Sequence, residues 1–326
     1  MTSPDGADEG RQATLSYADV LNGSRFLRLQ PDIGPPYRPC NPSVLRTPEG
    51  YLVNCRTVNF EQRRLRYFCD DADGVFRSRN VIMRLARDFT VLDERPMVID
   101  EPPLRQTAIQ GLEDCRLFEV EGTHFAFCAT TDRHPSGHIH LSVCRLLPDG
   151  RVAAHRPLVG PFDDRPQKNR LPFVDRLGNV CAIYGYDPLT VVRVSVDSGR
   201  YHVEAEIAHP WNAASWRGSA GPISTPGSDR LLILVHEAVT REAPDGQPER
   251  VYLHRFVECD SGFSLTRVSR PFVFAHQGVE FSCGMTLSHD RANLVVGLGI
   301  EDGSAYLCRI ALARVETLLH DMNVPG

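Results

Sequence analysis

The chain has 326 residues, of which 42% are hydrophobic and 24% charged, so it is long enough to bury a large core and is not a disordered tail. Its formal net charge of −5 argues against nucleic acid as the main partner. No apolar run approaches the roughly 20 residues that a membrane-spanning helix requires. Because residues 1–12 are polar and acidic and lack a signal-peptide pattern, we expect a soluble, cytoplasmic protein.

Short apolar runs, separated by Gly, Asp and Pro turns, follow one another along the whole chain. They are rich in Val, Leu, Ile, Phe, Tyr and Cys, which predicts β-strands and almost no helix. Five of the runs follow another strand-like run and a turn, so each is the second strand of a predicted hairpin. These second strands are 50–55, 124–128, 180–184, 231–235 and 293–297.

The five hairpins begin at broadly regular intervals, near Asn41, Asp114, Asn169, Gly218 and Phe281. Each interval of about 50 to 70 residues has room for four strands, which is typical of the blades of a β-propeller. We therefore predict an all-β fold, a five-bladed β-propeller. A two-sheet sandwich is the alternative, but it gives no reason for five equivalent hairpins.

The outer strands of the blades are also predicted from the sequence. They are 67–70 with 81–85, 140–146 with 151–155, 190–196 with 201–207, and 251–258 with 264–268. In the fifth blade, 305–311 is the third strand, and 25–29 near the N-terminus closes the ring as the outer strand. A short C-terminal helix is expected over 313–320. Residues 1–13 are expected to be disordered and 14–326 to form a single propeller domain.

Cysteine and histidine do not form metal-binding patterns in this sequence. The ten cysteines include no CxxC pair and mostly lie in apolar runs, so we expect small core residues. His134, His138 and His140 lie close together, but the neighbouring acids and cysteines lack the spacing of zinc ligands. No metal and no organic cofactor is expected.

Polar residues mark the ends of the predicted hairpins. In an up-and-down blade, the start of the first strand lies beside the end of the second. The starts carry Asn41, Glu113, Asp114, Lys168, Asn169, Trp216, Arg217 and Glu280, and the ends carry Arg56, Thr130, Thr131, Tyr184, Tyr186, Asp187, His236, Glu237, Glu301 and Asp302. We expect these side chains to converge on one mouth of the central channel and to form a pocket. The alternative is that strand ends are simply wet and polar.

Acids and bases in such a pocket have distinct expected roles. Glu113 and Asp114 are adjacent on a strand, so only one of them is expected to face the pocket. A partly desolvated carboxyl there has a raised pKa and can act as a general acid toward a leaving oxygen. Lys168 is the single lysine among 36 basic residues, which indicates a site that needs a compact ammonium.

The remaining polar and aromatic residues of the pocket suit a sugar or an anion. Arg56, Lys168, Arg217 and His236 are expected to hold an anion or oriented hydroxyl groups. Trp216, Tyr184 and Tyr186 would present ring faces to a sugar. A lectin without catalytic activity would use the same types of residue.

Several short motifs resemble those of a known enzyme family. Gly111-Leu112-Glu113-Asp114-Cys115-Arg116 resembles the Gly-x-Glu-Asp-Pro-Arg signature of glycoside hydrolase family 130, the five-bladed mannoside phosphorylases and related mannosidases. Later motifs of the family resemble three further segments in the same order. These are Lys168-Asn169 before Leu171-Pro172-Phe173, Gly221-Pro222-Ile223 followed by 232–236, and Gly299-Ile300-Glu301-Asp302. The resemblance extends over residues 38–315.

The resemblance implies roles for individual residues. Asp114 would be the general acid of a reaction that inverts the anomeric carbon. The expected binding residues for sugar or phosphate are Arg56, Glu113, Arg116, Lys168, Asn169, Tyr186, Arg217, His236, Glu280, Glu301 and Asp302. Two positions depart from the family: Cys115 replaces the proline of the signature, and Tyr186 stands where the phosphorylases place an arginine for phosphate. The second departure weakens the case for phosphorolysis.

The sequence therefore predicts an inverting carbohydrate-active enzyme whose partner is an oligosaccharide or a sugar phosphate. The first hypothesis is a mannoside-type phosphorylase, with inorganic phosphate as co-substrate and a sugar 1-phosphate as product or donor. Inverting hydrolysis is the nearest alternative, with Glu280 or Glu301 as the base for water. Glycosyl transfer and a non-catalytic glycan-binding propeller of a cell-envelope pathway are the others. The cations at the rim would be superfluous in a lectin for neutral sugars.

Overall fold

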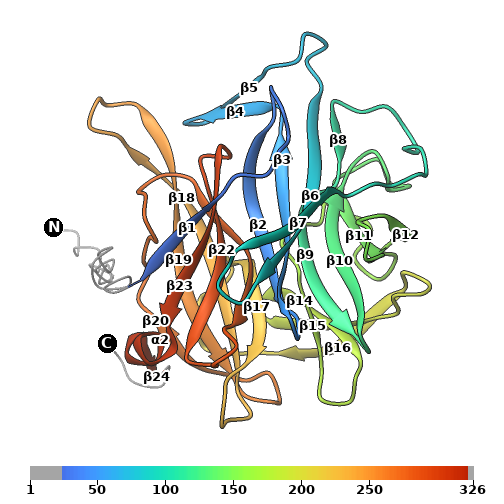
Figure 1. The fold of residues 1–326 in the computed structure, drawn as a ribbon. Coiled ribbons are helices and arrows are strands. Elements are labelled where there is room, and N and C mark those ends of the chain that lie inside the picture. Colours follow the sequence, from blue (N-terminus) through green and yellow to red (C-terminus); the bar gives the residue numbers. More distant parts are fainter. Residues whose placement is uncertain (1–23, 322–326) are drawn as a thin grey trace, which may run out of the picture.

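The computed structural model describes residues 24–321, which form five antiparallel sheets around a central axis (Figure 1). The expected all-β, five-bladed propeller is confirmed. The expectation for residues 1–13 lies outside the described residues. Among residues 24–321, no helix is long and apolar enough to cross a membrane.

In blades 1 to 4 the antiparallel strands follow chain order from the axis outward, whereas the outermost strand of blade 5 is the first described strand of the chain. Blade 1 contains β2 (Arg38–Arg46), β3 (Gly50–Val58), β6 (Phe76–Ala86) and β7 (Val91–Pro96), with β8 (Ile109–Gly111) parallel to β6. Blade 2 contains β9 (Glu113–Val120), β10 (Thr123–Thr130), β11 (His140–Leu146) and β12 (Val152–Pro157). Blade 3 contains β13 (Leu171–Val174), β14 (Val180–Tyr186), β15 (Leu189–Val194) and β16 (Tyr201–Ile207). The expected outer strands of blades 2 and 3 are confirmed.

The last two blades are completed by segments from the chain ends. Blade 4 contains β17 (Arg217–Ser224), β18 (Leu231–Glu242), β19 (Pro248–Cys259) and β20 (Leu265–Ser269). Blade 5 contains β21 (Glu280–Leu287), β22 (Asn293–Ile300), β23 (Ser304–Ala311) and β1 (Arg25–Leu29). Arg25 of β1 pairs with Arg309 of β23, so the expected closure of the ring is confirmed. A helix, α2 (Leu312–Leu318), follows, and β24 (Leu319–Asp321) adds an unexpected strand to β20.

Apolar side chains fill the space between neighbouring blades. Val53, Ile183, Leu234 and Val296, from the second strands of four blades, are all fully buried. The sheets are covered on both faces by other sheets, which explains why their strands are continuous apolar runs rather than alternating ones. The ten cysteines are free thiols; nine are buried and Cys69 is half-buried, so the expectation of core residues is confirmed.

One predicted strand is wrong. Residues 67–70 were expected in the third strand of blade 1, but that strand is β6, and β7 is the fourth. The segment instead belongs to a separate hairpin of β4 (Phe60–Arg63) and β5 (Arg66–Cys69), which projects at the top of Figure 1. Tyr67 and Phe68 are 45% and 46% exposed, so their apolar character does not mark a buried strand.

Candidate active site

A cavity of about 310 Å³ opens at the mouth of the channel on the side of the β4–β5 hairpin. Eight polar residues from the predicted hairpin ends of the five blades are in its lining, so these ends converge as predicted: Asn41, Arg56, Glu113, Asp114, Lys168, Asn169, His236 and Asp302. Seven of them belong to the expected site set. Asn41 was expected at this mouth as a strand start, without an assigned role.

The innermost strands reach this mouth through irregular backbone. Asn41, Asp114 and Asn169 have positive φ angles of 43°, 47° and 61°. Asn and Asp are the non-glycine residues that adopt this conformation most readily. The pairing of β9 with β10 also shifts register beside Asp114, so the strand bulges there. As a result both Glu113 and Asp114 line the pocket, and the expectation that only one of them would do so is wrong.

The carboxylate of Asp114 is held by two neighbours from blade 1. Arg56 Nη1 lies 2.9 Å from Asp114 Oδ1, and Asn41 Nδ2 donates to the same oxygen at 3.0 Å. Burial would raise the pKa of this carboxyl, but the charges of Arg56, Arg116 and Lys168 and the Asn41 hydrogen bond outweigh it and hold the pKa below its usual range. Asp114 is therefore a carboxylate in the free protein, whereas the sequence argument expected a raised pKa.

Arg56 joins the two acids of the signature. Its Nη2 lies 3.3 Å from Glu113 Oε2, and its Nε donates to Ser78 Oγ at 2.9 Å. Since Arg56, Glu113 and Asp114 are all buried, this group is a desolvated ion cluster with fixed geometry.

Arg116 lies beneath the pocket and connects the blades at the axis. Its guanidinium donates to the carbonyl oxygens of Asp114, Ser219 and Gly218 and to Asn169 Oδ1, at 3.2 to 3.4 Å, and lies 5.7 Å from the ring centre of Phe281. Arg116 does not line the cavity. It fixes the backbone of Asp114, so its place is below the binding residues rather than among them.

Lys168 and His236 line the opposite side of the pocket. The ammonium of Lys168 makes no hydrogen bond or ion pair with any side chain between residues 24 and 321, and the residue is exposed to the pocket. His236 is buried, and its Nδ1 lies 2.8 Å from Ser219 Oγ. Burial, with the charges of His254 and Arg116, holds the pKa of His236 well below its usual range. His236 is thus a neutral imidazole and not the expected cation.

Asp302 is a third carboxyl of the pocket, and its pKa is shifted in the opposite direction to that of Asp114. It lies in the turn between β22 and β23 with a φ of 46°. Burial raises its pKa to about 6, with the negative charges of Asp114 and Glu113 adding to the effect and Arg56 opposing it. The pocket therefore holds carboxyls whose pKa values are shifted in opposite directions, an arrangement typical of acid–base sites.

Besides Arg116, four of the expected site residues lie outside the cavity. The Arg217 guanidinium donates to the carbonyl oxygens of Ala214 and Trp216. Glu280 is fully buried and accepts hydrogen bonds from the backbone N–H groups of residues 274–276. Glu301 accepts from His276 Nε2 and the Val279 N–H.

The fourth, Tyr186, packs with Trp216 in the core between blades 3 and 4. Tyr184 is in the core between blades 2 and 3. The expectation that these rings face a sugar in the pocket is therefore wrong, because their strands turn them toward the neighbouring blades.

Sequence reasoning missed a group of pocket residues from the projecting hairpin and from blade 4. Phe60, Gln62 and Tyr67 come from the hairpin, and Tyr252 stacks on the His236 ring with centroids 5.0 Å apart. The exposed aromatic residues Tyr67 and Phe68 were a usable signal, but the segment 67–70 was assigned to a blade strand.

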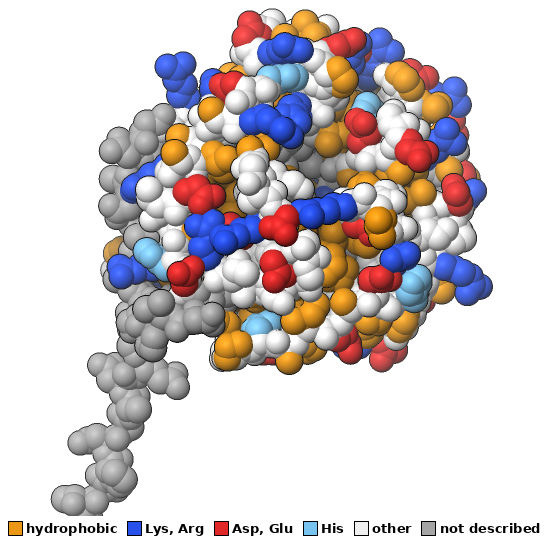
Figure 2. All heavy atoms as spheres, turned by 90° about the horizontal axis from the view of Figure 1, so that it is seen from below, with side chains coloured by type: hydrophobic (Ala, Val, Ile, Leu, Met, Phe, Trp, Pro, Cys, Tyr) orange, Lys and Arg blue, Asp and Glu red, His pale blue; other side chains and the backbone are white. Residues whose placement is uncertain are grey.

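The opposite mouth of the channel has a separate cavity. It measures about 440 Å³ and is lined by the far ends of the inner strands, including Arg46, Glu119 and Arg291. Figure 2 views the molecule from that end, where basic and acidic side chains are interspersed. Among residues 24–321, no three His, Cys, Asp or Glu side chains are grouped so as to hold a metal ion.

Comparison with known proteins finds the same fold in other solved structures. No protein-family model and no curated protein matches the sequence. A β-1,2-mannobiose phosphorylase from Listeria innocua, solved with β-1,2-mannobiose, is 15% identical, with a TM-score of 0.57 over 89% of this chain and 94% of that chain.

Two structures from Leishmania mexicana are also similar. A mannose phosphorylase solved with phosphate is 13% identical, with a TM-score of 0.58 over 92% of each chain. A GDP-Man-dependent mannosyltransferase is 13% identical, with a TM-score of 0.55 over 88% of this chain and 90% of that chain. These similarities establish the fold, so the propeller implied by the sequence resemblance is confirmed.

Proposed function

We propose that this protein is an inverting carbohydrate-active enzyme that breaks or makes the glycosidic bond of a mannoside, with inorganic phosphate as the attacking group during breakdown. The observation that carries the proposal is the position of Asp114. Its carboxylate is fixed by Arg56 and Asn41 at the base of a pocket that the free ammonium of Lys168 also lines. The fold is shared with two mannoside phosphorylases, which supports the same chemistry.

In this proposal, Asp114 delivers a proton to the glycosidic oxygen while a phosphate oxygen attacks the anomeric carbon from the opposite side. The bond between the anomeric carbon and the glycosidic oxygen breaks, and the leaving group departs as an alcohol with the proton of Asp114. The sugar leaves as a 1-phosphate of inverted configuration. Arg56, Asn41 and Arg116 hold Asp114 in place throughout.

A general acid must carry a proton when the substrate is bound, whereas Asp114 is ionised in the free protein. The cations that lower its pKa include Lys168, which is also the cation open to an anion. Bound phosphate would offset part of this positive charge, so the pKa of Asp114 would rise and the carboxyl would take up a proton. Phosphate binding would then load the acid for catalysis.

Hydrolysis is the second candidate, and the charge of the pocket favours it. Arg56 is already paired with two carboxylates, His236 is neutral, and Arg217 and Tyr186 lie elsewhere. The residues expected to serve as the base for water, Glu280 and Glu301, are outside the cavity. In a hydrolase, Asp302 would take that role from within the pocket.

The two reactions are separated by the dependence of turnover on phosphate. Wild-type protein is incubated with methyl β-mannoside and, separately, with β-1,2-mannobiose while phosphate is varied, and the products are separated. A phosphorylase produces mannose 1-phosphate at a rate that rises with the phosphate concentration. A hydrolase produces free mannose and no mannose 1-phosphate, and its rate does not depend on phosphate.

The Asp114→Asn variant tests the acid in either reaction. We expect its turnover to fall about 10²- to 10⁴-fold, while calorimetry shows sugar binding retained. Asp197→Asn, at an exposed turn between β15 and β16, is the matched control and should behave as wild type. Wild-type turnover by Asp114→Asn, or a wild-type protein that neither binds nor turns over any sugar or sugar phosphate, would contradict the proposal.

A further inference from the structure

The pocket has two layers of opposite polarity, which the strand register separates. Ser78 of β6 accepts the Arg56 hydrogen bond and so lies level with the charged base. Phe76, the first residue of β6, lies two residues before Ser78, and Ile109 of β8 pairs with it. At roughly 3.3 Å per residue, this second layer lies about 7 Å from the charged base.

Six aromatic or aliphatic side chains line the pocket together with this layer, and we call them the collar: Phe60, Tyr67, Phe76, Ile109, Ile139 and Val279. Phe60 contacts both Tyr67 and Phe76 edge to face, with ring centroids 5.7 and 5.4 Å apart. Tyr67 and Ile109 are 45% and 42% exposed, so apolar surface remains open at the pocket. The nearby Gln62 Nε2 donates to the Arg64 carbonyl at 2.9 Å.

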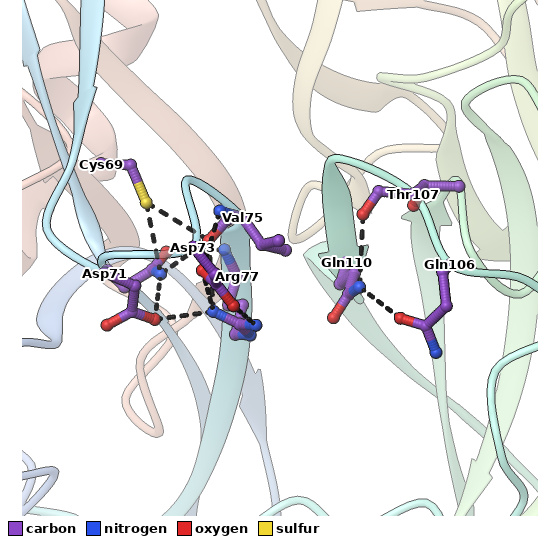
Figure 3. A network of polar contacts seen from close by, with 9 residues as sticks. Cys69, Asp71, Asp73, Val75, Arg77, Gln106, Thr107 and Gln110 are labelled. Carbon is purple, nitrogen blue, oxygen red and sulfur yellow. Dashed lines mark hydrogen bonds and ion pairs between the residues drawn. The ribbon is translucent and has the colours of Figure 1, made fainter.

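Polar contacts order the two chain segments next to Phe76 and Ile109, and Figure 3 shows both groups of contacts. Arg77 Nη1 lies 2.8 Å from Asp71 Oδ2, and Arg77 also pairs with Asp73, which fixes the turn before Phe76. On the other segment, Gln110 Nε2 donates to Gln106 Oε1 at 3.0 Å, and Thr107 Oγ1 donates to the Ile109 carbonyl.

An ion pair between hairpin tips adds to this support. Arg64, in the β4–β5 turn, pairs with Asp245, in the turn between β18 and β19. The segments that carry the collar are therefore tied to their neighbours on both sides of the pocket.

We propose that the group joined to the sugar through the glycosidic oxygen is an apolar aglycone, such as an alkyl or prenyl chain, rather than a second sugar. This inference rests on the proposed function, which puts the sugar and its reacting carbon at the charged base beside Asp114. The aglycone then extends outward through the collar. On breakdown, the bond from the anomeric carbon to oxygen is cut and the aglycone leaves as an alcohol that takes its proton from Asp114.

The chemistry of the collar distinguishes the two kinds of aglycone. A second sugar would set hydroxyl groups against Ile109, Ile139 and Val279, which offer no side-chain hydrogen bond, and would lose affinity for each unsatisfied group. Each buried methylene of an alkyl chain instead strengthens binding about fourfold. An occupant of both layers is therefore a molecule with one polar and one apolar end.

Matched alkyl glycosides test this inference. Methyl and hexyl β-glycosides of mannose, glucose and galactose are compared in pairs, so the sugar is the same within each pair and both leaving groups are simple alcohols. Affinity is measured by calorimetry with the Asp114→Asn variant, and kcat/KM with wild type in phosphate. We expect the hexyl compound of the accepted sugar to be favoured about tenfold or more in both measurements.

Variants of the collar locate the preference. Tyr67→Ser and Ile109→Asn change exposed side chains, and each should reduce the ratio of hexyl to methyl affinity severalfold. Leu177→Ser is the matched control, because Leu177 is 84% exposed at a turn of blade 3, and it should leave the ratio unchanged.

The outcomes separate this inference from the proposed function. Equal affinity and turnover for methyl and hexyl glycosides would overturn the apolar aglycone and leave the glycosidic chemistry standing. A hexyl preference that the collar variants do not reduce would also overturn it. If no glycoside is bound or turned over with or without phosphate, the proposed function fails and the inference fails with it.

Discussion

Asn41, Asp114 and Asn169 share a backbone conformation that costs about 1 to 3 kcal/mol at a non-glycine residue. Glycine would adopt it more easily, but glycine has no side chain to present to a ligand. At Asp114 the conformation lets two successive side chains face one cavity, which a regular strand cannot do. Strain of this kind persists where the surroundings fix it, and here Arg116 binds the Asp114 carbonyl from below.

Lys168 gives a prediction at the scale of a single side chain. Its ammonium is the cation in the pocket without an ion pair among residues 24–321, so Lys168→Ala should remove a charge-assisted contact to phosphate. One such contact of about 1.5 to 3 kcal/mol corresponds to roughly a 10- to 100-fold higher KM for phosphate. Steady-state kinetics with phosphate as the varied substrate measure it. Arg176→Ala, on an exposed turn, is the control, and an unchanged KM in Lys168→Ala would remove Lys168 from the anion site.

Among the elements, the outer edge of blade 4 is joined to the C-terminal helix by one buried acid. Glu258 of β19 is 1% exposed at its side chain and accepts hydrogen bonds from Arg230 and Arg267, each at 2.8 Å. Arg267 also pairs with Glu316 of α2 at 2.9 Å. Burial opposes ionisation of Glu258, but the bonds from Arg267 and Arg230 outweigh it and lower its pKa.

Glu258→Gln keeps the size of the side chain and removes its charge. We expect the free energy of unfolding to fall by about 1.5 to 3 kcal/mol, because the charge-assisted hydrogen bonds from Arg230 and Arg267 weaken. Urea unfolding gives the value. Glu249→Gln breaks the more exposed pair with Arg241 and should cost about 1 kcal/mol or less. An equal loss of unfolding free energy in the two variants would show that Glu258 stabilises this edge no more than an exposed ion pair does.

The elements also show where sequence reasoning succeeds. Apolar runs bounded by turns predicted the hairpins of all five blades, because propeller strands are buried on both faces and leave a strong local signal. Residues 67–70 gave the same signal for a different reason, since Tyr67 faces a cavity rather than the core. The strand Leu319–Asp321 is too short to leave a pattern, and it forms only because β20 offers a free edge.

For the whole molecule, buried histidines make stability depend on pH. Burial lowers the pKa of His140 and His155 to about 4 and that of His254 to about 3. Between pH 6.5 and 4, the unfolded chain takes up protons that the folded chain does not, so each of these histidines lowers the free energy of unfolding as the pH falls. Glu280 and Asp302, with pKa values raised to about 7 and about 6, act in the opposite sense.

His155→Phe isolates one of these contributions. The Nε2 of His155 has no hydrogen-bond partner, and Arg133, His134 and Arg156 around it oppose a positive charge. Relative to wild type, the variant should gain about 3 kcal/mol of stability as the pH falls from 6.5 to 4. Unfolding curves at several pH values measure the difference. His202→Phe, at an exposed ring, is the control, and a constant difference between His155→Phe and wild type would contradict the argument.

Across the molecule, the sequence predicted the meeting place of the polar strand ends better than the direction of each side chain. Asp114, Arg56 and Lys168 meet at one mouth as expected. Arg217 and Glu280 start equivalent strands, yet one binds nearby carbonyl groups and the other binds loop N–H groups. The direction of each side chain depends on strand bulges and on contacts with the neighbouring blade. A local sequence pattern holds no information on either.

The joining of β1 to β23 has a consequence for how the protein is made. Arg25 finds its partner only when Arg309 has left the ribosome, so the first described strand stays unpaired while the four blades between them are synthesised. Pairing between such distant segments makes folding slow and exposes a sheet edge to other chains meanwhile. A chain that stalls before residue 304 lacks β23, the partner of β1. We expect such a chain to aggregate rather than to fold as a smaller, four-bladed protein.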